Sequence, residues 1–126
     1  MLLGADLLTT KYRHLLEGKR IGLLAHQASV NSKGVHILAL LSNSKDWKLT
    51  TLFGPEHGFD TVAEDMIAVQ SSTETKTGLP IYSLYGHAES SLKPAAAVFE
   101  NIDVLVVDLQ DIGSRYYTYS WTTALC

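Results

Sequence analysis

Glu56 and His57 are the neighbouring residues best suited to acid–base chemistry, and they lie side by side in the stretch GPEHGFD. Glutamate is not a preferred turn residue, whereas the proline and the two glycines around it fix or permit sharp backbone turns. The carboxyl group of Glu56 would therefore project from a rigid turn near apolar strand ends, where loss of water favours the protonated form that a general acid needs. His57 could hydrogen-bond that carboxyl group or a substrate oxygen. The alternative is a structural role in which Glu56 pairs with Arg115 or another cation.

The elements that must position these residues alternate between buried strands and helices. The strand segments are continuous apolar runs, as expected where both faces of a sheet are covered. Strands are predicted at 20–25, 47–53, 79–86 and 102–111, and helices at 6–17, 35–43, 93–101 and from 115 onward. The polar segment 61–78 is predicted to be a long loop that carries a short helix. This alternation predicts a doubly wound α/β fold, with a parallel sheet and helices on both faces.

Polar and ionisable residues follow each of the four predicted strands. In a parallel sheet all carboxyl ends lie at one edge, and ligands bind in the crevice there. Four segments of the sequence therefore converge on one rim, which indicates a ligand site more strongly than any single motif does. The candidate residues are His26 and Gln27 after the first strand, Glu56 and His57 after the second, Tyr85, Gly86 and His87 after the third, and Asp108, Gln110, Asp111, Arg115, Tyr116 and Tyr119 after the fourth.

Most of these residues also have a purely structural interpretation. His26 and Gln27 could simply end a strand and begin a turn. Asp108 could cap a helix or brace a loop. An aspartate of the DxQD motif could form a structural pair with Arg115. His36 is predicted to lie within a helix as a surface or packing residue.

The aromatic residues near the end of the chain could belong to the core. Tyr117 and Trp121 have the spacing of one buried helix face. Tyr116 and Tyr119 would then face elsewhere, towards the rim, where rings that carry hydroxyl groups suit a sugar.

The composition is that of a globular domain. The 126 residues are 46% hydrophobic and 18% charged, with a formal net charge of −3. The ten basic residues are scattered, so neither a nucleic acid nor an anionic membrane surface is expected as a partner. No apolar run approaches the length of a membrane span. The single cysteine, Cys126, excludes an intrachain disulfide.

The two ends of the chain carry separate indications. The apolar start is interrupted by Asp6 and lacks the basic region and cleavage site of a signal peptide, so the protein is expected either to stay inside the cell or to have lost a leader. The chain stops in an apolar, helix-like stretch without a cap. We therefore expect residues 1–126 to be part of a longer protein.

Several cofactor and hydrolase signatures are absent from the sequence. No GxGxxG follows the first predicted strand, and there is no P-loop. The HExxH zinc motif and the GxSxG nucleophile elbow are also missing. The sequence therefore predicts neither a metal nor any other cofactor.

Four motifs, in chain order, resemble the N-terminal domain of the NamZ-type exo-acting β-N-acetylmuramidase family. They are GKRIGLLAHQASVNSKGVHILALL, LFGPEHGF, TKTGLPIYSLYG and DVLVVDLQDIGSRYYTY, and together they span about residues 18–122. The resemblance implies a Rossmann-like N-terminal domain, incomplete in this chain, and a smaller C-terminal domain, with the active site in the cleft between them. It implies that the enzyme releases N-acetylmuramic acid from the non-reducing end of peptidoglycan fragments. The remainder of the protein would supply the other half of the cleft.

The same resemblance assigns roles to particular residues. The glutamate of the PEHG motif is Glu56, which becomes the leading catalytic candidate, with His57 beside it. The DxQDxGxR group would bring four polar side chains into the same cleft. These are Asp108, Gln110, Asp111 and Arg115.

Glycoside hydrolysis usually needs two carboxyl groups that flank the scissile bond. Glu56 is predicted to act as the general acid, and the second group is either Asp108, Asp111 or a residue beyond this chain. A second hypothesis is a non-catalytic peptidoglycan- or sugar-binding module, which would keep the rim and its aromatic residues but would not need the acid. A third is an α/β hydrolase that acts on another small metabolite.

Overall fold

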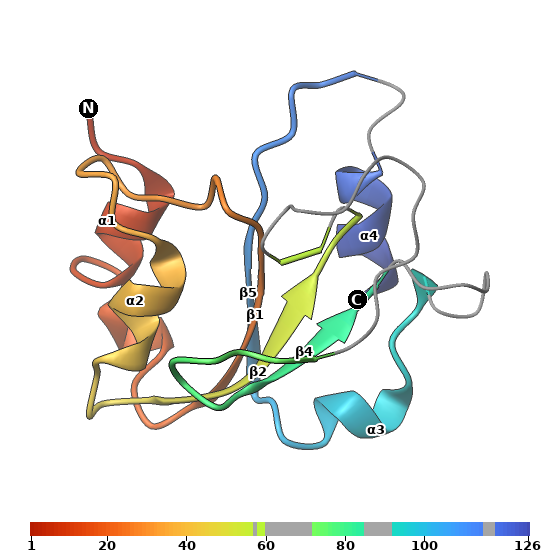
Figure 1. Ribbon diagram of the computed structural model, residues 1–126. Helices are drawn as coiled ribbons and strands as arrows, with labels where there is room; N and C mark the ends of the chain where they lie inside the picture. The colour runs from red at the N-terminus through yellow and green to blue at the C-terminus, as the bar shows by residue number, and fades with distance from the viewer. Residues whose placement is uncertain (57, 60–71, 85–91, 115–117) are drawn as a thin grey trace.

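The computed structural model describes residues 1–56, 58–59, 72–84, 92–114 and 118–126, which form a five-stranded sheet with helices on both faces (Figure 1). The strand order is β3-β4-β2-β1-β5, in which β4, β2, β1 and β5 run parallel. The strands are β1 (Arg20–Ala25), β2 (Lys48–Gly54), β3 (Ser72–Thr73), β4 (Pro80–Ser83) and β5 (Val104–Asp108). The predicted α/β class is therefore confirmed.

One strand departs from the expected all-parallel sheet. β3 pairs antiparallel with β4 at the edge of the sheet, and it lies in the segment 61–78 that was predicted to be a loop with a short helix. It has only two residues, Ser72 and Thr73, and both are exposed, so it has no apolar pattern that could have indicated a strand. Residues 60–71 lie outside the described part of the chain.

The helices are short and form two layers. Figure 1 shows α1 and α2 on one side of the sheet and α3 and α4 on the other. Their bounds are α1 (Gly4–Leu8), the 3-10 helix η1 (Arg13–Leu15), α2 (Ile37–Ser42), α3 (Ala96–Phe99) and α4 (Tyr119–Leu125). No helix among the described residues is long and apolar enough to cross a membrane.

The predicted helix over 6–17 is wrong in its extent. The chain leaves the α-helix at Thr9, and only a short 3-10 turn follows. The hydroxyl of Thr10 donates a hydrogen bond of 2.7 Å to the backbone oxygen of Asp6. Threonine side chains compete with the backbone in this way, and the threonine pair TT therefore ends a helix that the apolar spacing alone would continue.

The central strand β1 is buried on both faces. Ile21, Leu23 and Ala25 belong to the apolar cluster beneath α1 and α2, whereas Leu24 points to the opposite cluster, where it meets Phe53. All five of the residues that follow Arg20 in this strand are buried. This double burial explains the continuous apolar run in the sequence.

The register of the sheet brings the ends of the parallel strands together. Ala25 of β1 pairs with Asp108 of β5, and Leu24 of β1 pairs with Phe53 of β2. The last residue of β2, Gly54, pairs in turn with Ser83 of β4. The polar residues that follow these strands therefore start from one edge of the sheet, as expected for a parallel α/β fold.

Candidate active site

Glu56 lies in a tight reverse turn at the end of β2. The backbone nitrogen of Gly58 donates a hydrogen bond of 2.9 Å to the oxygen of Pro55, and Gly58 has a φ of 81°, in the region that favours glycine. A Cβ atom on Gly54 would lie 2.6 Å from the backbone nitrogen of Phe59, so the chain folds back directly over this glycine. The turn leaves Glu56 only 9% exposed.

The carboxylate of Glu56 is anchored by a residue far away in the sequence. The hydroxyl of Thr118, the residue that precedes α4, donates a hydrogen bond of 2.7 Å to Oε2 of Glu56. The alternative prediction paired Glu56 with a cation, but no ion pair among the described residues includes it. Arg115, the named candidate for that pair, lies outside the described residues, as does His57.

The buried side chain of His26 lies between two segments of backbone and contacts an amide nitrogen in each. The backbone nitrogen of Ala28 lies 3.0 Å from Nδ1, and that of Gln110 lies 3.1 Å from Nε2. A neutral imidazole has one acceptor nitrogen, so only one of the two amides is hydrogen-bonded in a given tautomer. The ring of His26 also packs against that of Tyr119, with centroids 5.3 Å apart. His26 thus links the ends of β1 and β5 to the first turn of α4.

Ser29 fixes the same two strand ends through its hydroxyl group. Oγ of Ser29 accepts a hydrogen bond of 3.0 Å from the backbone nitrogen of His26 and donates one to the backbone oxygen of Asp108. Ser29 is fully buried. One small side chain therefore bridges the backbones of β1 and β5 at the rim, in addition to the pairing of the two strands.

Asp108, the last residue of β5, carries a carboxyl group with an unused oxygen. Its Oδ2 atom is buried and accepts no hydrogen bond from the described residues. Burial raises the pKa of this carboxyl group, and the nearby His26 and His36 partly offset the rise. A buried polar atom without a partner is uncommon in a folded protein and indicates a place for a ligand or an ordered water.

The other predicted site residues are less central in the described part of the structure. Gln27 and Gln110 are exposed on the rim, and Asp111 is exposed with Oδ1 accepting a hydrogen bond of 2.7 Å from the backbone nitrogen of Gly113. Tyr119 is buried. The predicted candidates that lie outside the described residues are His57, Tyr85, Gly86, His87, Arg115 and Tyr116.

The interpretation of the aromatic cluster is wrong at one position. Trp121 was expected to share a buried helix face with Tyr117, yet it is 72% exposed, while Tyr119 packs against His26. The helix α4 begins only at Tyr119, so the described part of it presents Tyr119 and Thr122 to the protein interior. Spacing alone could not fix which face of this short helix is covered.

His36 was predicted to lie within a helix, and that position is wrong. It is the N-cap of α2 and not a mid-helix residue, because its Nδ1 accepts a hydrogen bond of 3.1 Å from the nitrogen of Leu38. Its Nε2 lies 2.9 Å from the backbone oxygen of His26 and therefore carries the proton. Its ring also meets the edge of Phe59. His36 thus connects α2 to the turns after β1 and β2.

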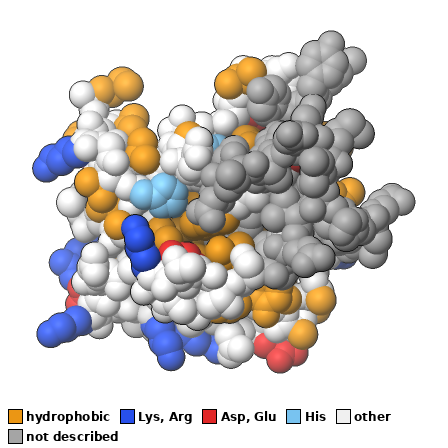
Figure 2. All heavy atoms as spheres, viewed as in Figure 1, with side chains coloured by type: hydrophobic (Ala, Val, Ile, Leu, Met, Phe, Trp, Pro, Cys, Tyr) orange, Lys and Arg blue, Asp and Glu red, His pale blue; other side chains and the backbone are white. Residues whose placement is uncertain are grey.

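No group of three His, Cys, Asp or Glu side chains in the described segments is placed to hold a metal ion. Basic side chains on the face seen in Figure 2 are separated by neutral surface and form no continuous patch. The arrangement can instead offer one buried, hydrogen-bonded carboxylate, Glu56, and a half-buried carboxyl group, Asp108, whose Oδ2 atom is buried. Glu56 follows β2 and Asp108 ends β5, the two strands that flank β1.

These features define an α/β domain in which polar side chains gather at the carboxyl edge of the parallel strands. Residues 21–126 match the family model described as "Exo-beta-N-acetylmuramidase NamZ, N-terminal". The chain belongs to this family.

Relatives with known sequences and structures agree with that assignment. The chain is 44% identical, over 121 residues, to the peptidoglycan β-N-acetylmuramidase NamZ of Bacillus subtilis strain 168, covering 96% of this chain and 28% of that protein. Crystal structures of two DUF1343 family proteins from Bacteroides fragilis NCTC 9343 superpose with TM-scores of 0.84 and 0.71, at 35% and 32% identity. The matched regions cover 98% and 97% of this chain, and 30% and 29% of the two Bacteroides fragilis chains. The chain therefore spans less than a third of the length of these relatives.

Proposed function

We propose that the full-length protein is a glycosidase that releases N-acetylmuramic acid from the non-reducing end of peptidoglycan fragments. Membership of the family supports this reaction class, and the Bacillus subtilis relative is named as a peptidoglycan β-N-acetylmuramidase. The observation that carries the proposal is the buried carboxylate of Glu56, fixed by Thr118 at the carboxyl edge of the sheet.

In this proposal Glu56 is the general acid that protonates the glycosidic oxygen. A general acid has to be held in one orientation, because a proton is transferred only over hydrogen-bonding distance. The turn after β2 restricts the backbone of Glu56, and the hydroxyl of Thr118 restricts Oε2. The proposal assigns the other carboxylate oxygen, Oε1, to the substrate.

A second carboxyl group is supplied by Asp108 in this proposal. Its strand pairs with β1, which also pairs with β2, so Asp108 and Glu56 stand two strands apart on the same edge. The buried and unpartnered Oδ2 of Asp108 suits a group that meets substrate or a water molecule. Asp111 is a poorer candidate, because it is exposed and one of its oxygens holds a turn. A carboxylate from another part of the protein is the competing source.

The test is the Glu56→Gln substitution in the full-length protein, assayed with a chromogenic β-N-acetylmuramide. The amide keeps the size of the side chain and an acceptor oxygen for Thr118 but cannot supply the proton. We expect a fall in kcat of roughly 10²–10⁴, the usual contribution of general acid catalysis. The matched control is Glu17→Gln, a half-exposed glutamate that pairs with Arg13 and should keep full activity.

Near-normal turnover by the Glu56→Gln variant, with unchanged far-ultraviolet circular dichroism, would remove Glu56 from the mechanism. If the wild-type protein binds muramic-acid ligands without any hydrolysis, and the variant binds them equally well, the protein is instead a sugar-binding module. The same two measurements with Asp108→Asn decide whether Asp108 or a residue elsewhere is the second carboxyl group.

A further inference from the structure

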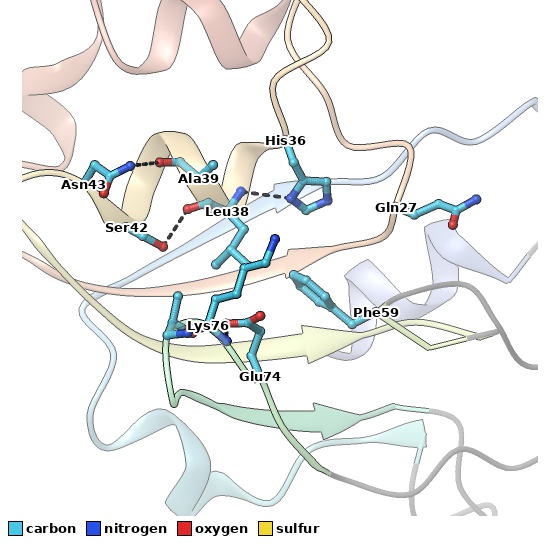
Figure 3. Close-up of a pocket in the computed structure, with 10 residues that line it drawn as sticks. Gln27, His36, Leu38, Ala39, Ser42, Asn43, Phe59, Glu74 and Lys76 are labelled. Atoms are coloured by element: carbon cyan, nitrogen blue, oxygen red, sulfur yellow. Dashed lines mark hydrogen bonds between the residues drawn. The ribbon is translucent and has the colours of Figure 1, made fainter.

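A cavity of about 480 Å³ lies beside the rim, on the face of the sheet that α2 covers. Figure 3 shows the residues that border it, on α2, at Phe59 and on the turn that joins β3 to β4. Its wall is partly apolar, through Leu38, Ala39 and Phe59. The cavity therefore has room for a small group that has both an apolar and a polar part.

Lys76 is the one cationic side chain among the described residues that line this cavity. Figure 3 shows it extending from the β3–β4 turn towards α2. The ion pairs among the described residues do not include it. An ammonium group in a partly apolar cavity can offer a carboxylate a favourable charged hydrogen bond.

The neighbouring carboxylate of Glu74 is already committed to its own turn. Its Oε2 accepts hydrogen bonds from the backbone nitrogen of Lys76 at 3.0 Å and from the hydroxyl of Thr77 at 2.6 Å. Although burial opposes the change, these hydrogen bonds from Thr77 and Lys76, together with the positive charge of Lys76, lower the pKa of Glu74. Glu74 therefore shapes the turn that presents Lys76, while the ammonium group of Lys76 extends beyond it.

Three other polar side chains in the wall, those of His36, Ser42 and Asn43, donate hydrogen bonds within the protein. Nε2 of His36 faces the backbone oxygen of His26, so its proton is used. The hydroxyl of Ser42 and the amide of Asn43 donate to the backbone oxygens of Leu38 and Ala39. Charge recognition in this cavity would thus depend on Lys76.

The cavity and Glu56 share one segment of chain. Phe59 lines the cavity and belongs to the same turn as Glu56. On the other side, His36 contacts His26, which packs against Tyr119, the residue after the Thr118 that holds Glu56. The turn that carries Glu56 therefore also supplies one wall of the cavity.

We propose that this cavity binds the lactyl carboxylate of N-acetylmuramic acid, with Lys76 as its ionic partner. The inference rests on the proposed function, because it deepens the account of the same substrate. The lactyl group combines a methyl group with a carboxylate, which matches a cavity with an apolar wall and one cation. It is also the group that distinguishes N-acetylmuramic acid from N-acetylglucosamine. Lys76 is thereby a specificity-determining residue for the reaction.

The test compares two substrates that differ only in this charge. They are 4-nitrophenyl β-N-acetylmuramide and the methyl ester of its lactyl group, each hydrolysed by the full-length protein. Lys76→Met removes the charge and keeps most of the length of the side chain, and Lys76→Arg restores a cation. Lys45→Met, at an exposed lysine that does not line the cavity, is the matched control.

For the free acid, we expect Lys76→Met to raise KM by roughly tenfold with little change in kcat, as the loss of one charged contact would. The KM for the methyl ester should stay the same, Lys76→Arg should recover most of the loss, and Lys45→Met should match the wild type. An unchanged KM for the acid, or an equal rise for the acid and the ester, overturns the inference.

The inference can also be tested if the wild-type protein hydrolyses neither substrate, which would count against the proposed activity alone. Calorimetric titration with N-acetylmuramic acid and N-acetylglucosamine then gives the readout. The wild-type protein should bind the former more tightly, and Lys76→Met should remove that preference. Equal binding of the two sugars by the wild type contradicts the assignment of the cavity.

Discussion

Thr118 and Glu56 are joined by a hydrogen bond of 2.7 Å across 62 residues of chain. Thr118 directly precedes α4, and Glu56 lies in the turn that follows β2. The hydrogen bond therefore joins a helix on one face of the sheet to the edge where the parallel strands end. The buried carboxylate is therefore held by the tertiary structure and not only by its own turn. The contact orients one oxygen of Glu56 before any substrate arrives, and such preorganisation favours catalysis.

Replacing Thr118 by valine should lower kcat by roughly tenfold or more, because a hydrogen bond to a charged group contributes about 1.5–3 kcal/mol. KM should change little, since the substrate is not expected to contact the hydroxyl. Kinetics with the chromogenic muramide check this, with Thr118→Ser as the variant that restores the hydroxyl. Thr123→Val serves as the control, because that hydroxyl bonds only to the backbone oxygen of Tyr119 in its own helix. Equal kcat values for the two valine variants would contradict the role of Thr118.

Asp108→Asn should raise the free energy of unfolding at neutral pH. At acid pH the variant should have no such advantage over the wild type. Burial raises the pKa of Asp108 in the folded protein above its unfolded value of about 4. The folded state thus retains a proton that the unfolded state has released, so the contribution of this residue to stability falls as pH rises from about 4 through the folded pKa. Below pH 4 both states are protonated and the contribution is constant.

The measurement is thermal unfolding of the wild type and of Asp108→Asn at pH 7 and at pH 3. The variant should melt at a higher temperature at pH 7 only, while losing activity if Asp108 is the second carboxyl group. Asp111→Asn, at an exposed position of the same segment, should not show this pH-dependent gain. A gain of the same size at both pH values would mean that the charge of Asp108 is not its cause.

Gly54→Ala should destabilise the turn that carries Glu56. The added Cβ would lie 2.6 Å from the backbone nitrogen of Phe59, which cannot move without opening the turn. We expect a loss of about 1–3 kcal/mol in the free energy of unfolding, together with lower activity. Gly4→Ala, where nothing lies within 4 Å of the new atom, should be neutral or slightly stabilising. Denaturation midpoints of the two variants compare these costs directly.

The isolated 126-residue chain should self-associate. β5 forms one edge of the described sheet, with Val107 39% exposed, and Ile112 and Trp121 are exposed apolar residues in the segments after it. Unprotected apolar edge strands pair readily with other chains. Light scattering after size-exclusion chromatography should show oligomers, and Val107→Lys should reduce them. A monomeric, cooperatively unfolding wild-type chain would show that this surface is harmless.

Local sequence patterns were sufficient for much of the fold. β1 has the predicted bounds, because a strand buried on both faces has a continuous apolar run. The rim was also predictable, since the parallel order alone places the residues after Ala25, Gly54 and Asp108 on one edge. The helix over 6–17 and the burial of Trp121 failed because both depend on contacts that spacing does not encode.

The sequence singled out Glu56 as the leading candidate but gave no sign of the contacts that hold it. Glu56 was conspicuous because an acid in a Gly-Pro turn is unusual, whereas Thr118 looked like any threonine before a helix. His36 was placed inside a helix because the apolar pattern begins just before it, yet its ring caps that helix. Lys76 had no distinguishing neighbour in the sequence, since its cavity is formed by α2 and by Phe59.

The buried hydroxyl of Ser29 has a consequence for how such a domain can diversify. It bridges β1 and β5 through two backbone groups, those of His26 and Asp108. The bridge does not depend on which side chain stands at position 108, so that side chain can be exchanged during evolution while the bridge is kept. His26 is different, because its own ring lies against the backbone nitrogens of Ala28 and Gln110. Evolution can therefore alter the carboxyl group at this edge more freely than the histidine beside it.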